Sequence, residues 1–283
     1  MNKVAKFHVP SLIAIKHAYL DIFWAKQDLT AIITPHALAS SKAFILHDPE
    51  GSLWNEYAMM FSNSGYIIKY LNLSNLKSSV RYNPMAHFTE EASVYKFASA
   101  LMNNTKGLGE PGDTDFVFRE NMLFNALLSY IYYETLENEK DMKSLTLLLE
   151  NMIADNDHNG FRSATDYLFD DKQREEPWHT APRLYNDFKS ALNDGEQGRR
   201  IVESCLSRIA PLNTPEMIAF TSKDELKLDS LKNPKTALFI MDGDAAEDIK
   251  FLVPLVYSQL LDVQHSERNN HVKPHTIENL GLN

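Results

Sequence analysis

Cysteine and long apolar runs are nearly absent from this chain of 283 residues, which has one cysteine, Cys205. A single cysteine excludes an intramolecular disulfide framework and suits a reducing compartment. No run approaches the roughly 18 apolar residues that a membrane helix needs. The apolar stretch after Pro10 is broken by Lys16, His17 and Asp21, and no small-residue cleavage site follows it. We therefore expect neither a membrane span nor a secretory signal.

Basic residues are also in deficit. Lys and Arg number 28 against 38 Asp and Glu, which gives a net charge of −10. A broad duplex-DNA interface needs a basic face, so we expect weak or no binding to duplex DNA. The remaining composition, 44% hydrophobic and 23% charged, is typical of a globular protein with a real core.

Three short apolar runs predict buried strands at 43–46, 66–73 and 236–241. The first and third runs are nearly continuous and stop at turn residues. This pattern is typical of central strands in a parallel sheet that is covered on both faces. A short buried helix would look similar, and the flanking Pro and Gly favour strands.

Between these runs the chain has a helical pattern. Apolar residues at helical spacing predict helices at 90–103, 116–134, 144–154, 183–192, 199–209 and 249–263. Strands, then helices, then strand and helix again predict an α/β core with a helical insertion from about Pro84 to Pro211. The polar tail from His265 to Asn283 is expected to fray.

Residues Gly107 to Gly112 fit the pattern G-x-G-x-x-G. A dinucleotide site needs this turn between a strand and a helix, so that free N–H groups face the phosphates. Here the turn joins two predicted helices, and it carries Glu110 and Asp113, whose charges repel phosphate. A flexible loop is the favoured interpretation.

A second motif resembles a calcium loop. Asp155, Asp157 and Asn159 have suitable oxygen spacing, and Asp166 falls at the twelfth position, where a carboxylate closes the coordination shell. Against this, Arg162 stands where an apolar residue is usual, and no second loop pairs with this one. A solvated turn between two helices is favoured over a metal site, so no metal or other cofactor is expected.

Two further groups are expected in the core. Cys205 lies on the apolar side of a predicted helix, near Ile201 and Ile209, and we expect it to be a small core residue. The aromatic residues of the helices at 116–134 and 183–192 could stack single-stranded bases, but at helical spacing they more often form core.

The densest basic cluster contains Arg199, Arg200 and Arg208. Arg200 and Arg208 are eight residues apart, which would put them roughly on one side of a helix. Glu196 and Glu203 lie among them, so a solvated face with ion pairs is the favoured interpretation. The alternative is a small contact point for single-stranded DNA or for an acidic partner protein.

Six segments carry a family resemblance through their order along the chain. They are Asp48-Pro49-Glu50-Gly51, Arg81-Tyr82-Asn83-Pro84, Arg208-Ile209-Ala210-Pro211-Leu212, the segment 221–229 with Asp224 and Glu225, the strand at 235–240, and Tyr257-Ser258-Gln259-Leu260. Together they resemble the coupling proteins of conjugation and type IV secretion, the TraG/TraD type. The resemblance covers about residues 34–263.

The chain departs from this family where the chemistry lies. A phosphate-binding loop needs glycines, a lysine and a Ser or Thr hydroxyl. By the family pattern that slot falls on Gln27-Asp28-Leu29, and no glycine precedes Gly51 in the sequence. The family's strand ending in Asp-Glu is also not found in residues 265–283. We therefore expect no ATPase activity.

The resemblance implies an α/β fold, a partial RecA-like parallel sheet with a large all-helical insertion. Residues 1–84 and 212–283 would form the core, and residues 85–211 the insertion. It implies a component of conjugative DNA transfer on a mobile genetic element, with the helical domain as a substrate- or partner-recognition module. Its partners would be a relaxase–DNA complex or secretion-channel proteins.

An alternative remains open, namely a decayed or truncated ATPase subunit of a DNA-translocating hexamer, and with it an oligomer. Both hypotheses imply a cytoplasmic protein that reaches the inner face of the membrane through its partners.

Overall fold

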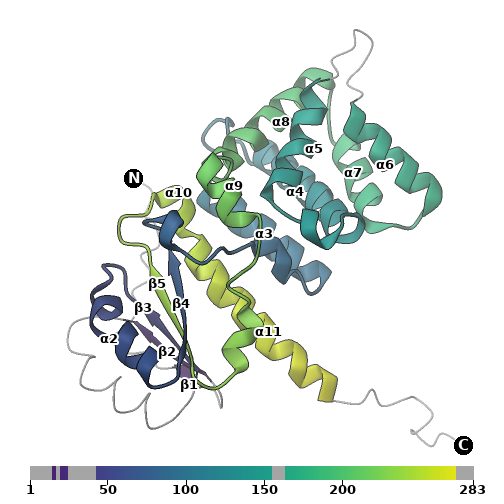
Figure 1. Cartoon of the computed structure of the whole chain (residues 1–283). Coiled ribbons are helices and arrows are strands. Elements are labelled where there is room, and N and C mark those ends of the chain that lie inside the picture. Colours follow the sequence, from purple (N-terminus) through teal and green to yellow (C-terminus); the bar gives the residue numbers. More distant parts are fainter. Residues whose placement is uncertain (1–14, 17–19, 25–42, 155–162, 272–283) are drawn as a thin grey trace, which may run out of the picture.

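The computed structural model describes residues 15–16, 20–24, 43–154 and 163–271. Figure 1 shows two parts: a sheet flanked by helices α2 (Ser52–Asn63) and α11 (Leu252–His271), and a group of helices from α3 to α9. The order of elements confirms an α/β fold with a helical insertion between the strands.

The sheet has five strands in the order β1-β2-β3-β5-β4. They are β1 (Ile15–Lys16), β2 (Leu20–Trp24), β3 (Ala43–His47), β4 (Ile67–Asn72) and β5 (Thr236–Met241). Strands β2, β3, β5 and β4 are parallel, and β1 pairs antiparallel with β2. All three predicted strands are confirmed, and β3 and β5 lie inside the sheet. Strand β2 was not predicted because Asp21 interrupts its apolar run.

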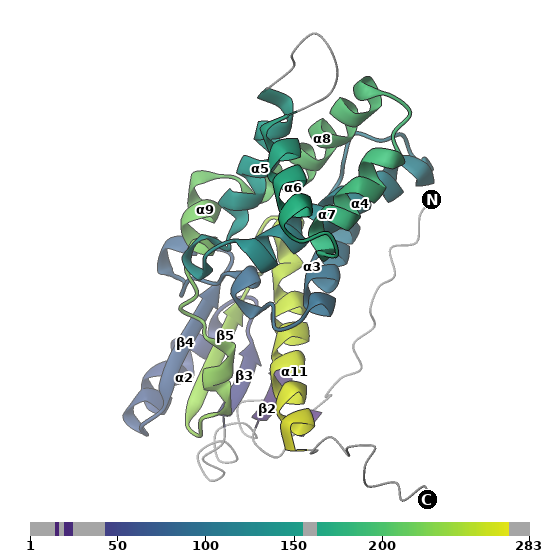
Figure 2. The same ribbon diagram turned by 90° about the vertical axis from the view of Figure 1, so that its right-hand side faces the viewer.

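Both faces of the sheet are covered because alternate residues of β3 and β5 point to opposite sides. On one face, Phe44 and Phe239 pack with Phe61 of α2. On the other face, Ile45 and Ile240 belong to the same core as α11 and the helical part. Figure 2 shows α11 alongside the sheet, with α3 above it. One apolar core therefore continues from the sheet into the helices.

All six predicted helices are present. The helical part contains α3 (Glu91–Asn104), α4 (Thr114–Glu134), α5 (Met142–Ala154), α6 (Ala164–Glu175), α7 (Thr180–Ser190), α8 (Gly195–Ile209) and α9 (Pro215–Thr221), and the short α10 (Glu247–Lys250) precedes α11. Helices α2, α6 and α9 were not predicted. The tail was expected to fray from His265, and α11 extends through its first residues to His271.

Acidic and hydroxyl side chains begin several of these helices. The Asp113 carboxylate accepts from the N–H of Phe116 at the start of α4. Asp194 does the same for Gln197 in α8, at 2.8 Å. Each cap satisfies an N–H that has no partner within its helix, and its negative charge suits the positive end of the helix dipole.

The centre of the helical part is a buried ion pair between α4 and α8. Arg208 donates from Nε to Glu120 Oε1 at 2.9 Å and from Nη2 to Oε2 at 2.7 Å. The side chains are 7% and 0% exposed. Nη1 of Arg208 donates to the carbonyl of Thr105 at 2.6 Å, and Ser204 donates to Glu120 at 2.5 Å. The network joins the end of α3 to α4 and α8.

The loop after α3 closes over this ion pair. A side chain at Gly107 would collide with the carboxylate of Glu120 and with Ser204, and the N–H of Leu108 donates to Ser204 at 2.6 Å. The G-x-G-x-x-G segment therefore joins two helices, as expected, but its first glycine permits close packing on a charged pair. This packing differs from the flexible loop that we expected.

The other core predictions have clear outcomes. Cys205 is buried, and burial raises the pKa of its thiol well above the usual range, so the thiol stays protonated. Of the eight aromatic residues of α4 and α7, four are buried, Phe116, Phe124, Tyr185 and Phe188, and Tyr130 and Tyr132 pack against the core. Phe118 and Tyr133 are exposed, at 59% and 43%. Within the described ranges, no helix has both the length and the apolar character needed to cross a bilayer.

We predict that Glu120→Gln lowers the free energy of unfolding by about 3–5 kcal/mol, because it leaves Arg208 buried without its counter-charge. Urea unfolding measures the change. Arg199→Ala is the matched control: Arg199 pairs with Glu196 at the surface of α8, the helix that carries Arg208, and its loss should cost less than about 1 kcal/mol. Equal effects of the two substitutions would contradict the assignment of a central role to the buried pair.

Candidate functional site

The carboxyl ends of the parallel strands form one edge of the sheet, where ligands of open α/β sheets usually bind. Asp48 follows β3 and Asp242 follows β5, and the N–H of Asp48 donates to the carbonyl of Ile240 at 2.8 Å. The ring of His47 lies 2.9 Å from Asp242, measured from Nε2 to Oδ1. Two predicted family segments thus meet at this edge.

Asp48 itself is occupied by its own helix. Its carboxylate, 2% exposed, accepts from the N–H of Trp54 at 2.8 Å and from the hydroxyl of Ser52 at 3.3 Å. Gly51 has a left-handed backbone with φ of 76°, and a side chain there would also collide with Met241. The segment from Asp48 to Gly51 is therefore a tight turn from β3 into α2, and each oxygen of its carboxylate accepts a hydrogen bond from α2.

The charges at this edge are mostly negative. The described segments 47–51 and 241–250 hold six carboxylates, Asp48, Glu50, Asp242, Asp244, Glu247 and Asp248, and one lysine, Lys250. Lys250 pairs with Glu247 at 2.7 Å. The hydrogen bond to Glu247, with the nearby charges of Asp242 and Asp244, raises the pKa of Lys250. Acidic side chains therefore outnumber basic ones in the described segments that follow β3 and β5.

A second group of predicted residues meets where the chain enters and leaves the helical part. Arg81 donates from Nε to Glu225 Oε1 at 2.9 Å, and its backbone N–H donates to Oε2 at 3.1 Å. The N–H of Glu225 donates back to the Arg81 carbonyl at 2.9 Å. The hydrogen bonds from Arg81 lower the pKa of the Glu225 carboxyl. These hydrogen bonds join the segment that enters the helical part to the segment that leaves it.

Asn83 and Asp224 extend this junction toward α3 and α5. Asn83 donates from Nδ2 to the carbonyl of Lys140 at 2.7 Å, and its Oδ1 accepts from the N–H of Met85 at 3.0 Å. Nε2 of His87 lies 3.2 Å from Oδ1 of Asp224. Asn83 therefore caps the turn at 84–87 and fixes the loop before α5.

Tyr82 connects the junction to α11. Its hydroxyl donates to Oε1 of Gln259 at 2.7 Å, and Nε2 of Gln259 donates to the carbonyl of Pro84 at 2.8 Å. Tyr82 is fully buried. Burial raises the pKa of its hydroxyl well above the usual value, so the phenol remains a donor.

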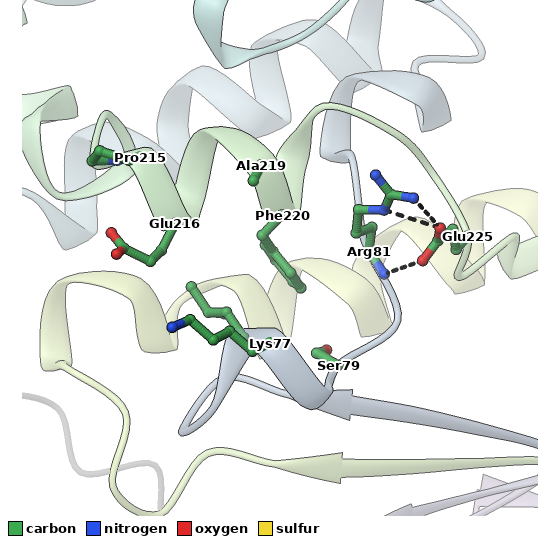
Figure 3. Close-up of a pocket in the computed structure, with 9 residues that line it drawn as sticks. Lys77, Ser79, Arg81, Pro215, Glu216, Ala219, Phe220 and Glu225 are labelled. Atoms are coloured by element: carbon green, nitrogen blue, oxygen red, sulfur yellow. Dashed lines mark hydrogen bonds and ion pairs between the residues drawn. The ribbon is translucent and has the colours of Figure 1, made fainter.

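A pocket of about 390 Å³ opens beside the junction, between segment 76–81 and α9 (Figure 3). Its lining residues are Leu76, Lys77, Ser79, Arg81, Pro215, Glu216, Ala219, Phe220 and Glu225. Arg81 and Glu225 face each other across one wall and neutralise each other. The pocket is small and mixed in character, and no catalytic arrangement lines it.

The remaining predicted residues do not form one site. Asp155, Asp157 and Asn159 lie outside the described residues. Asp166 begins α6, where its carboxylate accepts from Ser163 and Tyr185 and pairs with Lys189 at 2.8 Å. In the part of the chain that the structure describes, no group of three His, Cys, Asp or Glu side chains could hold a metal ion.

The three arginines have different environments. Arg199 pairs with Glu196 at 3.0 Å, and Arg200 is exposed, with its guanidinium 5.9 Å from the ring centre of Phe116. Arg208 is buried against Glu120. Arg208 is therefore not available to a partner, and a contact point would be limited to Arg199 and Arg200.

Sequence reasoning missed the importance of Glu120 and the pairing of Tyr82 with Gln259. A signal existed for Glu120, which stands four residues after Phe116 and four before Phe124, on the apolar stripe of α4. A carboxylate at such a position requires a buried cation. The partner of Tyr82 could not be read from the sequence, because 177 residues separate the two.

The junction and edge segments lie inside a match to one protein family. Residues 29–278 match the model of the family described as type IV secretory system, conjugative DNA transfer. The match begins at Leu29, so Gln27 and Asp28 precede it. No curated protein matches the chain. Because the match covers most of its length, the chain belongs to this family.

Tyr82→Phe should lower the free energy of unfolding by about 1–3 kcal/mol, because it leaves the buried Oε1 of Gln259 without a donor. Denaturant unfolding of the full chain measures this. Tyr133→Phe removes a hydroxyl at the surface and should change the value by less than about 0.5 kcal/mol. A Tyr82→Phe protein with the wild-type midpoint would show that α11 is not held through this hydrogen bond.

Proposed function

We propose that this member of the conjugative DNA transfer family is a binding component without ATPase activity, and that the helical insertion at residues 85–211 recognises a partner. The observation that carries the proposal is a contrast between the two parts. The sheet edge offers carboxylates where a nucleotide would need cations, whereas the helical part is organised around a fully satisfied buried network.

Two features support the absence of ATPase activity: the charge that phosphoryl transfer requires and the residues that occupy the phosphate-loop slot. Phosphoryl transfer depends on a lysine and Mg²⁺ to neutralise the developing charge. The slot that family order assigns to this loop, Gln27-Asp28-Leu29, has an aspartate and neither glycine nor lysine. Strand β2 ends at Trp24, three residues before the slot, in register with His47 of β3.

We predict no measurable binding of ATP with Mg²⁺ in a calorimetric titration of the full chain at up to about 100 µM nucleotide. The acidic edge and the missing lysine are the physical reasons. As the matched variant, Asp28→Lys tests whether charge alone is limiting. Micromolar ATP binding by the unmodified chain would contradict this part of the proposal.

The distribution of charge supports recognition of a protein by residues 85–211. Residues 85–211 contain 22 Asp and Glu against 13 Lys and Arg, a net charge of −9 out of −10 for the whole chain. Affinity for duplex DNA comes largely from Lys and Arg, which release condensed counterions. A part this acidic is suited to a protein, and we propose that it contacts the relaxase of a transferred DNA–protein complex or a secretion-channel protein.

We predict that the full chain binds the relaxase of its own element and binds a duplex oligonucleotide more weakly than about 10 µM at physiological salt. Fluorescence anisotropy with labelled relaxase, duplex and single-stranded DNA measures all three. Submicromolar duplex binding would contradict the proposal. Loss of single-strand binding in Arg199→Ala with Arg200→Ala would instead favour a DNA contact point on α8.

A further inference from the structure

Trp178 is the most exposed large apolar side chain in the described part of the chain, with 95% of its surface accessible. It lies in the turn between α6 and α7. An indole is the largest apolar side chain that a protein can present, and tryptophan is enriched among the residues that dominate binding energies. Such a residue, left outside the core, is a candidate anchor for a partner.

The turn that carries Trp178 is held from both sides. The N–H of His179 donates to the carbonyl of Glu176 at 3.0 Å, and Nε2 of Gln173 donates to the carbonyl of Pro177 at 2.7 Å. His179 also caps α7, accepting from Ala181 at 3.1 Å. The backbone beneath the indole is therefore ordered before any partner arrives, which lowers the entropy lost on binding.

The ring of His179 ties this turn to the end of α4. Its Nε2 lies 2.9 Å from Glu134, and its ring centre lies 5.1 Å from that of Tyr133, which is 43% exposed. Lys172 of α6 contacts the same Glu134 at 2.8 Å, and the exposed Leu168 stands one turn before Lys172. We call Tyr133, Leu168 and Trp178 the Trp178 surface.

Acidic groups outnumber basic groups around the Trp178 surface. The carboxylates are Glu134, Asp170, Asp171, Glu175 and Glu176, against Lys172, Arg174 and Arg183. Lys172 pairs with Glu134 and Glu176, and Arg174 pairs with Asp171 at 2.7 Å. Five carboxylates against three basic side chains leave a net charge of −2 among these residues, which favours a basic partner segment over an acidic one.

We propose that the Trp178 surface is a docking site for a basic segment of a protein partner that also carries apolar side chains. This proposal rests on the partner-recognition function proposed above. Arginine and lysine are attracted to the face of an indole, and their charge is opposite to the net charge of the neighbouring residues. Nucleic acid could stack on the same indole but would be disfavoured by that net negative charge.

The test uses the full chain and two labelled synthetic peptides of 12 residues. One peptide has four Arg and two Leu in a Gly/Ser background, and the other has Glu in place of each Arg. We expect the Arg peptide to bind, with affinity that falls as salt rises, and Trp178→Ala to weaken it at least tenfold. Phe118→Ala, an exposed aromatic at the opposite end of α4, is the matched control and should leave binding unchanged.

Two results would overturn the proposal: equal binding of the Arg peptide by wild type and Trp178→Ala, or equal or tighter binding of the Glu peptide or of a (dT)12 oligonucleotide. Trp178→Ala should keep the wild-type melting temperature, because the indole is exposed. The relaxase titration separates the two proposals. Relaxase binding that survives Trp178→Ala refutes the docking site alone, whereas peptide binding without relaxase binding refutes the proposed function alone.

Discussion

The buried pair between Glu120 and Arg208 is the constraint on which the helical part depends. Removing two charges from water is costly, and the cost is offset only when every donor and acceptor has a partner. Here the guanidinium bonds the carboxylate twice and the end of α3, while Ser204 occupies the carboxylate from α8. The same network explains Gly107, because only a residue without a side chain can close the loop over it. Three helices and one loop are therefore fixed by one interaction.

The segments that carry the family resemblance form the turns between elements and the connections between the sheet and the helical part. Asp48 begins α2, Gly51 supplies the left-handed turn before it, and Tyr82 fixes the crossing into the helical part against α11. These roles are structural in this chain. Family membership therefore explains the architecture, and it does not by itself supply a catalytic group. This distinction separates the shared fold from the chemistry that a particular member performs.

The sequence predicted the elements whose burial is one-sided or complete, and missed those whose burial is slight. Strands β3 and β5 were readable as apolar runs, whereas α6 is rich in charge and buries little beyond Thr165, Asp166 and Phe169. The contacts of the candidate site were harder to predict, because the residues that pair there are distant in sequence.

Arg200 and Arg208 were expected on one side of α8, but a helix turns by about 80° beyond two full turns over eight residues. That rotation is enough to place Arg200 at the surface and Arg208 in the core.

The distribution of charge connects the fold to the kind of function that it supports. In the segments after β3 and β5, six carboxylates stand against one lysine, which is itself paired with Glu247. Residues 85–211 carry a net charge of −9, and the buried pair of Glu120 and Arg208 contributes nothing to it. A negative electrostatic potential of this kind attracts basic partners and repels nucleic acid. At about 0.1 M salt the potential is screened over a distance of about 10 Å. Binding to a protein that is itself bound to DNA would satisfy both conditions, because the protein supplies the basic surface and keeps the phosphates at a distance.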